Sequence, residues 1–289
     1  MASKRRMRTS AGSCLYDFII YLAVGLFALA CFIPFLYVLT FSITPYEEYL
    51  RNPINIFPRN ITFTAYRDIF KFRLFVSGFK NTLFITIVST MIHMLLLVLS
   101  AYPLSKGNLK GRKFLFWIVL FTMFFNGGII PSYYLISKLH LINNLWALIL
   151  PVAIGAYPVI LLINFFRDLP EELSESAFID GANDLVILVK IILPVSVPAL
   201  VTLALFHAVY QWNSFFHAVL YTPKQSLWPL QLVLRELVTQ SEAQQVQSAV
   251  MPFTIKMAAI MSAMLPMVCA YPFAQKYFMK GLLMGSVKG

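Results

Sequence analysis

The chain has 289 residues, of which 59% are hydrophobic and 12% are charged, with a mean hydropathy of +0.75 and a net charge of +11. Ordinary soluble domains carry about 25% charged residues, so this composition excludes a single soluble core and indicates a membrane protein. The basic residues are spread over many loops, which argues against a nucleic-acid-binding domain as the source of the positive charge.

Six long apolar runs predict an all-α membrane protein with six spanning helices, because a spanning helix needs about 20 apolar residues. The first run is too long for the apolar core of a signal peptide, so we expect it to be retained. A transmembrane domain over 18–280 would then lie between tails at 1–17 and 281–289. The expected spans are 18–44, 81–104, 114–137, 141–166, 191–215 and 257–277.

The orientation follows from the distribution of Lys and Arg. They are denser in alternate segments, above all in the N-terminal tail and in residues 105–113, than in the segments between. Since loops rich in Lys and Arg stay in the cytoplasm, we expect both termini and the loop 167–190 to be cytoplasmic.

Three segments within or between the spans have a composition that leaves two interpretations open. Residues 45–80 combine prolines, aromatic rings and charges, which is typical of chain at the membrane surface and also of a partner-binding loop. Asn126-Gly127-Gly128 predict a helix break, as a turn buried in the bundle or as part of a cavity wall. Residues 230–240 predict an amphipathic helix, either interfacial or in contact with a partner.

Several chemical motifs are missing from the sequence. No G-x-x-x-x-G-K-[ST] loop is present to hold the phosphates of ATP. The three cysteines and four histidines show no metal-ligand spacing, and the predicted spans contain no carboxylate for intramembrane proteolysis. We therefore expect no catalytic residue, no metal site and no cofactor in this chain.

Polar side chains form one face on each of two apolar spans. In the second span these are Thr82, Thr86, Ser89, His93 and Ser100, and in the fifth they include Ser196, His207, Gln211 and Ser214. Such faces avoid lipid, so they make interhelical hydrogen bonds, typically worth about 0.6 kcal/mol each, or they line an aqueous path. The candidate path residues are Thr86, Ser89, His93, His207, Gln211 and Asn213.

The segment from Pro170 to Pro198 is the most distinctive. Six of the twelve acidic residues lie between Asp168 and Asp184. Proline followed by two glutamates suits a helix start, Gly181 suits a left-handed helix stop, and Asn183 suits the N-cap of a second helix. The sequence therefore predicts a short exposed helix–turn–helix between two spans.

The spacing in this segment carries a family resemblance. Glu175-Ser176-Ala177, three residues, Gly181, nine residues and Ile191-x-Leu193-Pro194 resemble the EAA loop of permeases of binding-protein-dependent ABC importers, with Ser176 in place of an alanine. Residues 124–151 resemble the sugar-importing branch, particularly the subfamily for complex and often acidic oligosaccharides such as alginate or pectin fragments. The resemblance extends from about residue 15 over nearly the whole chain.

The resemblance implies a type I importer permease with a five-helix core and an extra N-terminal helix, in the bacterial cytoplasmic membrane. The implied partners are a second permease subunit, two subunits that bind ATP and Mg, an extracytoplasmic solute-binding protein, membrane lipid and an oligosaccharide substrate. ATP hydrolysis in the partner subunits would drive import through the loop 167–190. The implied coupling residues are Glu175, Ser176, Ala177, Asp180, Gly181, Leu193 and Pro194.

Other functions remain open on the sequence. A permease of the same superfamily could import an amino acid or a metal, although residues 124–151 favour sugar. From another class, the chain could be a membrane scaffold of an envelope complex. An excess of basic over acidic residues in 45–80 and at Lys138 would give a positive outer mouth, which favours an anionic substrate.

Overall fold

The computed structural model describes the backbone of residues 11–53, 57–243 and 252–286, and within these ranges all regular structure is helical. The chain forms two compact units, Met1–Ile69 with Gln247–Met261, and Phe70–Val246 with Ser262–Gly289. The predicted all-α fold class is confirmed in the described ranges. The predicted C-terminal tail, 281–289, lies partly outside them, and the described part continues the last helix, α15 (Phe253–Ser286).

The first unit contains α1 (Ala11–Ser42), α2 (Tyr46–Arg51), most of α3 (Thr64–Lys71) and the start of α15. Aromatic rings hold these parts together, with Tyr49 stacked on Phe253 at 4.5 Å between centroids and Phe41 edge-on to Tyr49 at 5.3 Å. The first helix already begins at Ala11, so the tail predicted for 1–17 is helical over its last seven residues, 11–17. The side chains of α1 from residue 16 to 33 are exposed, as on a helix that faces lipid or another chain.

The segment that follows α1 is folded back by one carboxylate. Glu48 accepts hydrogen bonds from the backbone N–H groups of Arg59, at 2.6 Å, and Asn60, at 3.1 Å. The bond from the Arg59 N–H holds the pKa of the Glu48 carboxyl below its usual value. Thus at least residues 59 and 60 are fixed against α2.

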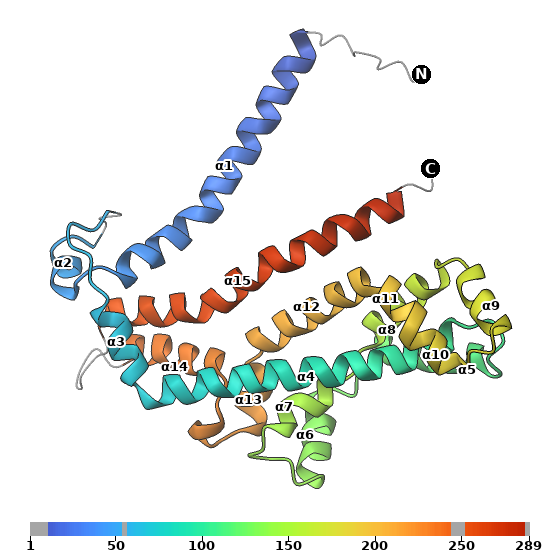
Figure 1. Cartoon of the computed structure of the whole chain (residues 1–289). Helices are drawn as coiled ribbons and strands as arrows, with labels where there is room; N and C mark the ends of the chain where they lie inside the picture. The colour runs from blue at the N-terminus through green and yellow to red at the C-terminus, as the bar shows by residue number, and fades with distance from the viewer. Residues whose placement is uncertain (1–10, 54–56, 244–251, 287–289) are drawn as a thin grey trace. The chain divides into compact units, whose positions relative to one another are not determined.

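The second unit is built around one long helix, α4 (Arg73–Ser105), which contacts α8, α12 and α14 (Figure 1). The other helices in chain order are α5 (Arg112–Phe124), α6 (Ile129–Lys138), α7 (Trp146–Ile149), η1 (Leu150–Val152), α8 (Ala156–Arg167), α9 (Glu172–Ile179), α10 (Asp184–Ile187), η2 (Leu188–Ile192), α11 (Leu193–Val195), α12 (Val197–Asn213), α13 (Phe216–Tyr221), η3 (Gln225–Leu227) and α14 (Leu230–Ala243).

The six predicted spans correspond to three continuous helices and three bent pairs. The continuous ones are Tyr16–Ser42, Arg73–Ser105 and Phe253–Pro272. The regions predicted as spans 114–137, 141–166 and 191–215 bend by 112°, 48° and 80° between their two halves. The sequence predicted a break only in the first of them, at Asn126-Gly127-Gly128. If each bent pair counts as one span, the described residues hold up to six spans.

Local chemistry explains the bends. Gly128 takes a φ of +86°, and its N–H donates to Asn126 Oδ1 at 2.9 Å, so the predicted break after α5 is confirmed. Extended backbone at Gly155 separates η1 from α8. Before α12, Ser196 leaves helical geometry and Pro198 follows in the first turn of the new helix, where its missing N–H costs nothing.

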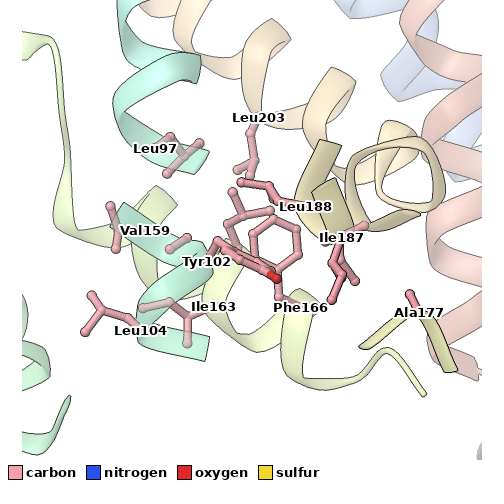
Figure 2. Close-up of a cluster of buried hydrophobic side chains, with 13 residues drawn as sticks. Leu97, Tyr102, Leu104, Val159, Ile163, Phe166, Ala177, Ile187, Leu188 and Leu203 are labelled. Carbon is pink, nitrogen blue, oxygen red and sulfur yellow. The ribbon is translucent and has the colours of Figure 1, made fainter. Parts of the chain in front are cut away.

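One hydrophobic cluster joins α4 and α8 to the base of the acidic segment (Figure 2). At its centre the ring of Tyr102 meets that of Phe166 edge-on at 6.2 Å. Ala177 of α9 and Ile187 of α10 pack into the same cluster. The acidic segment is therefore anchored on α4 and α8.

At its other end, α4 holds α14 through a close approach at Gly78. A Cβ atom at this position would lie 2.9 Å from Val233 Cγ2 and 3.4 Å from Leu230 Cα. The hydroxyl of Thr82 accepts the Leu230 N–H at 2.7 Å, which satisfies one free donor at the start of α14. The predicted amphipathic helix over 230–240 is confirmed by α14, with Leu230 and Val233 fully buried against α4.

We expect Gly78→Leu to weaken the packing of α14 against α4, because the larger side chain has no space between these two helices. Overpacking of this kind costs about 1–3 kcal/mol. The melting temperature of the purified protein should fall, whereas Gly25→Leu, at a position with no atom within 4 Å, should leave it unchanged. Equal melting temperatures for Gly78→Leu and the unaltered protein would contradict the packing described here.

Candidate functional site: the acidic helix–turn–helix

The candidate site begins where α8 ends and Pro170 opens the acidic segment. The Pro170 carbonyl accepts the Leu173 N–H at 3.3 Å, and the Glu171 carbonyl accepts the Ser174 N–H at 2.9 Å. Glu172 and Glu175 occupy the first turn of α9, where negative charge is favourable next to the positive end of the helix dipole. The predicted helix start is confirmed.

The helix stops at Gly181 with a double hydrogen bond. The Ala182 N–H donates to the Ala177 carbonyl at 3.0 Å, and the Gly181 N–H donates to the Phe178 carbonyl at 3.1 Å. This is the Schellman pattern, which needs a left-handed residue at the turn, and Gly181 has a φ of +82°. The predicted glycine stop is confirmed, and only glycine takes this backbone without strain.

The second helix starts two residues later at Asn183, as predicted. The Asn183 side-chain oxygen accepts the Val186 N–H at 2.9 Å and caps α10. The chain then widens into a π-helix, η2, just before Pro194. A wider turn suits this place, because Pro194 has no N–H for the carbonyl of Lys190 and its ring would collide with that carbonyl in a regular α-helix.

The predicted coupling residues fall into two groups. Glu175, Ser176, Asp180 and Gly181 are exposed on α9 and its turn, and Pro194 is exposed farther on. Ala177 is buried in the cluster of Figure 2 and Leu193 packs against that cluster, so these two hold the segment onto the chain and do not face outwards. The Ser176 hydroxyl donates to the Glu172 carbonyl at 2.9 Å, so serine fits at this position without a further partner.

The sequence prediction missed the exposed apolar side chains of this segment. Phe178 is 68% exposed, Ile179 is 85% exposed, and Leu185 on α10 is 64% exposed. Large apolar groups on a short polar helix indicate a surface that another protein covers. The available signal was the pair Phe178-Ile179 standing between a buried alanine and the helix-stop glycine.

A cavity of about 640 Å³ opens beside the start of α9. Its wall includes Glu171 and Glu175 from the acidic segment, Lys106 and Arg112 from residues 105–113, and Arg167 from the end of α8. The Arg167 guanidinium donates to the Leu104 carbonyl at 3.2 Å, which ties α8 to the end of α4. The acidic helix thus stands next to a group of cations.

A second set of predicted residues forms a buried polar network between α4 and α12. The Gln211 amide donates to Ser89 Oγ at 2.8 Å and to the Leu148 carbonyl at 3.1 Å. Ser89 Oγ and His207 Nε2 are 2.9 Å apart, so the Ser89 hydroxyl is left to donate to His207. The ring of His207 stacks on that of His93 at 4.0 Å between centroids, and His93 Nδ1 bonds to the Ala153 carbonyl.

The network joins α4, α7 and α12 and the turn after η1, and its members are almost completely covered within this chain. Thr86 is buried close by with no hydrogen-bond partner for its hydroxyl among the described residues, and Asn213 is exposed and bonds back to the Val209 carbonyl of its own helix. The burial favours the alternative of interhelical hydrogen bonding. A path lined by Thr86, Ser89, His93, His207, Gln211 and Asn213 stays a prediction.

Comparison with known proteins agrees with the motif in this segment. Residues 113–283 match the family model of the binding-protein-dependent transport system inner membrane component. The polygalacturonan/rhamnogalacturonan transport system permease protein YtcP of Bacillus subtilis is 42% identical over 95% of this chain and 99% of its own length. Protein LplC of the same organism is 40% identical over the full length of both chains.

A solved structure is also similar. A chain of a bacterial ABC transporter involved in the import of the acidic polysaccharide alginate superimposes with a TM-score of 0.86 and 30% identity, over 94% of this chain and 99% of that one. The family match covers more than half of the present chain, and the fold match extends over nearly all of it. The chain therefore belongs to the family of binding-protein-dependent transport system inner membrane components and is a permease subunit of an ABC importer, with no ATPase site of its own.

Proposed function

We propose that this permease imports an acidic, uronate-containing oligosaccharide across the bacterial cytoplasmic membrane. The observation that supports this substrate class is the 42% identity, over almost the whole of both chains, to a permease named for polygalacturonan and rhamnogalacturonan. The likeness to the alginate importer supports the same class of anionic sugar. The excess of basic residues in 45–80 would attract such an anion to the outer mouth.

The proposed complex contains a second permease subunit, two ATP-binding subunits and an extracytoplasmic solute-binding protein. In it, the acidic helix–turn–helix docks on an ATP-binding subunit through Phe178 and Ile179, with Glu175 and Asp180 at the polar rim. ATP and Mg bind to those partners. Closure of the ATP-binding subunits biases the permease between two conformations, which requires that α9 make different contacts in each.

The substrate class is tested by stimulation of ATP hydrolysis. The complete transporter is reconstituted in liposomes with its binding protein and given oligogalacturonate or alginate oligosaccharides, with maltodextrins of equal length as the neutral control. We expect the uronates to stimulate hydrolysis and the maltodextrins to leave it at the basal rate. Stimulation by maltodextrins alone would exclude an acidic substrate, and stimulation by an amino acid or metal alone would exclude a sugar.

The proposed orientation places both termini in the cytoplasm and is tested by thiol labelling. Single cysteines replace Asn108 and Gln225, both exposed, in a protein without its three native cysteines. An impermeant reagent added outside intact cells should label the cysteine at 225 and not the one at 108. After lysis both should react, and labelling of position 108 in intact cells would overturn this orientation.

A further inference from the structure

A groove of about 590 Å³ lies at the end of α4, separate in most of its lining from the cavity beside α9. One part of its wall is apolar, with Leu99 and Pro103 from α4, Leu109 from the loop between α4 and α5, Leu185 from α10 and Leu188 from η2. Leu99 is 52% exposed and Leu185 is 64% exposed, so the apolar part is open along a membrane-spanning helix.

The other part of the groove is positively charged. Lys106 and Lys110 line it, and within the described ranges neither lysine has an ion-pair partner. The Lys106 ammonium lies 5.0 Å from the centre of the Tyr102 ring, a cation–π contact that holds it at the groove. Asp184 is the one carboxylate among the described lining residues, so the lysines outnumber it.

We propose that this groove binds an anionic glycerophospholipid, with its phosphate at Lys106 and Lys110 and an acyl chain along Leu99, Leu185 and Leu188. The shape and the charge both support this occupant, because the apolar part follows a spanning helix and Lys106 comes directly after the last turn of that helix. Basic pockets between membrane helices on the cytoplasmic side bind anionic headgroups in this way. The assignment rests on the proposed orientation, in which this end of α4 is cytoplasmic.

The position of the groove gives the lipid a structural role. Leu188 lies in the hydrophobic cluster that also holds Ala177 and Ile187, and Leu185 is on α10, four residues after the helix-stop glycine. An acyl chain against Leu185 and Leu188 would cover the exposed side of α10. Anionic lipid would thereby stabilise the base of the segment that docks on the ATP-binding subunit.

The test is native mass spectrometry of the complete purified transporter, titrated with phosphatidylglycerol or phosphatidylcholine. The variant Lys106→Gln with Lys110→Gln should weaken phosphatidylglycerol binding about 30-fold, as two lysines near an anionic headgroup together contribute. The matched control is Lys113→Gln with Lys190→Gln, which removes equal charge from exposed positions outside the described lining and should retain the lipid. Leu185→Asn should also weaken binding, because it alters the apolar part without changing the charge.

Four results would overturn the lipid assignment. The first two are binding of phosphatidylcholine as tight as that of phosphatidylglycerol, and a loss of binding in the control double variant as large as in Lys106→Gln with Lys110→Gln. The third is full competition by sn-glycerol 3-phosphate, which has the phosphate without acyl chains. The fourth is that the complete complex retains no lipid, which would show that another subunit fills the groove. Melting curves of the variants establish that each is folded. Lipid binding is measured without transport, so failed sugar uptake with retained lipid would refute the proposed function and leave this inference standing.

Discussion

Gly181→Val is expected to separate ATP hydrolysis from uptake. At a φ of +82° a β-branched residue is strained by about 1–3 kcal/mol. No atom lies within 4 Å of the new Cβ, so the expected effect comes from backbone strain and not from a steric clash. The turn between α9 and α10 would open, and Phe178 and Ile179 would leave the partner surface at a wrong angle. Uptake should fall at least about tenfold, which corresponds to about 1.4 kcal/mol, while basal hydrolysis in the purified complex continues.

Gly181→Asn is the matched variant for this prediction. Asparagine tolerates the left-handed conformation better than other side chains, so it should preserve most of the uptake. The two variants are compared at equal amounts of assembled complex. If Gly181→Val shows normal uptake and normal stimulation of hydrolysis by the loaded binding protein, the turn has no part in coupling.

Gln211→Leu is expected to destabilise the permease rather than to slow it specifically. The change removes two hydrogen bonds and leaves the Leu148 carbonyl and the Ser89 hydroxyl buried without that donor. An unpaired buried polar group costs about 1–3 kcal/mol, so the melting temperature in detergent should fall by several degrees. Transport per folded complex should stay constant.

Asn213→Leu controls for the loss of an amide two residues away. Asn213 is exposed, and its amide nitrogen bonds to its own helix, so the melting temperature should change little. His93→Leu, in the same buried network, should behave like Gln211→Leu. A normal melting temperature in Gln211→Leu together with reduced transport per complex would instead assign this side chain to the translocation path.

The local features of the acidic segment could be predicted from the sequence because each depends on neighbouring residues only. A left-handed stop at Gly181 and a cap at Asn183 follow from the chemistry of one residue and the next few along the chain. The burial of Ala177 depends on a distant helix pair and could not be seen in this way. The outward position of Phe178 and Ile179 was missed although the sequence predicted an exposed segment that contains this apolar pair.

The geometry of the spans, unlike the turns of the acidic segment, could be predicted only in part. The length of the apolar runs identified the segments that are suited to a membrane. Hydropathy does not report the direction of a helix axis, so the bends within 141–166 and 191–215 were missed, although Gly155 and Pro198 lie at them. The polar face of α4 could be predicted from the helical spacing of its polar residues. Its partners on α7 and α12 could not be predicted, because helix pairing is not local.

The most direct test of the account is uptake of radiolabelled oligogalacturonate into liposomes that contain the complete transporter, with the binding protein on one side and ATP on the other. We expect accumulation that requires ATP and the binding protein, exceeds that of a maltodextrin of equal length, and is lost in Gly181→Val while basal hydrolysis remains. Equal accumulation without ATP, or no accumulation of any oligosaccharide by a complex that hydrolyses ATP, would contradict it.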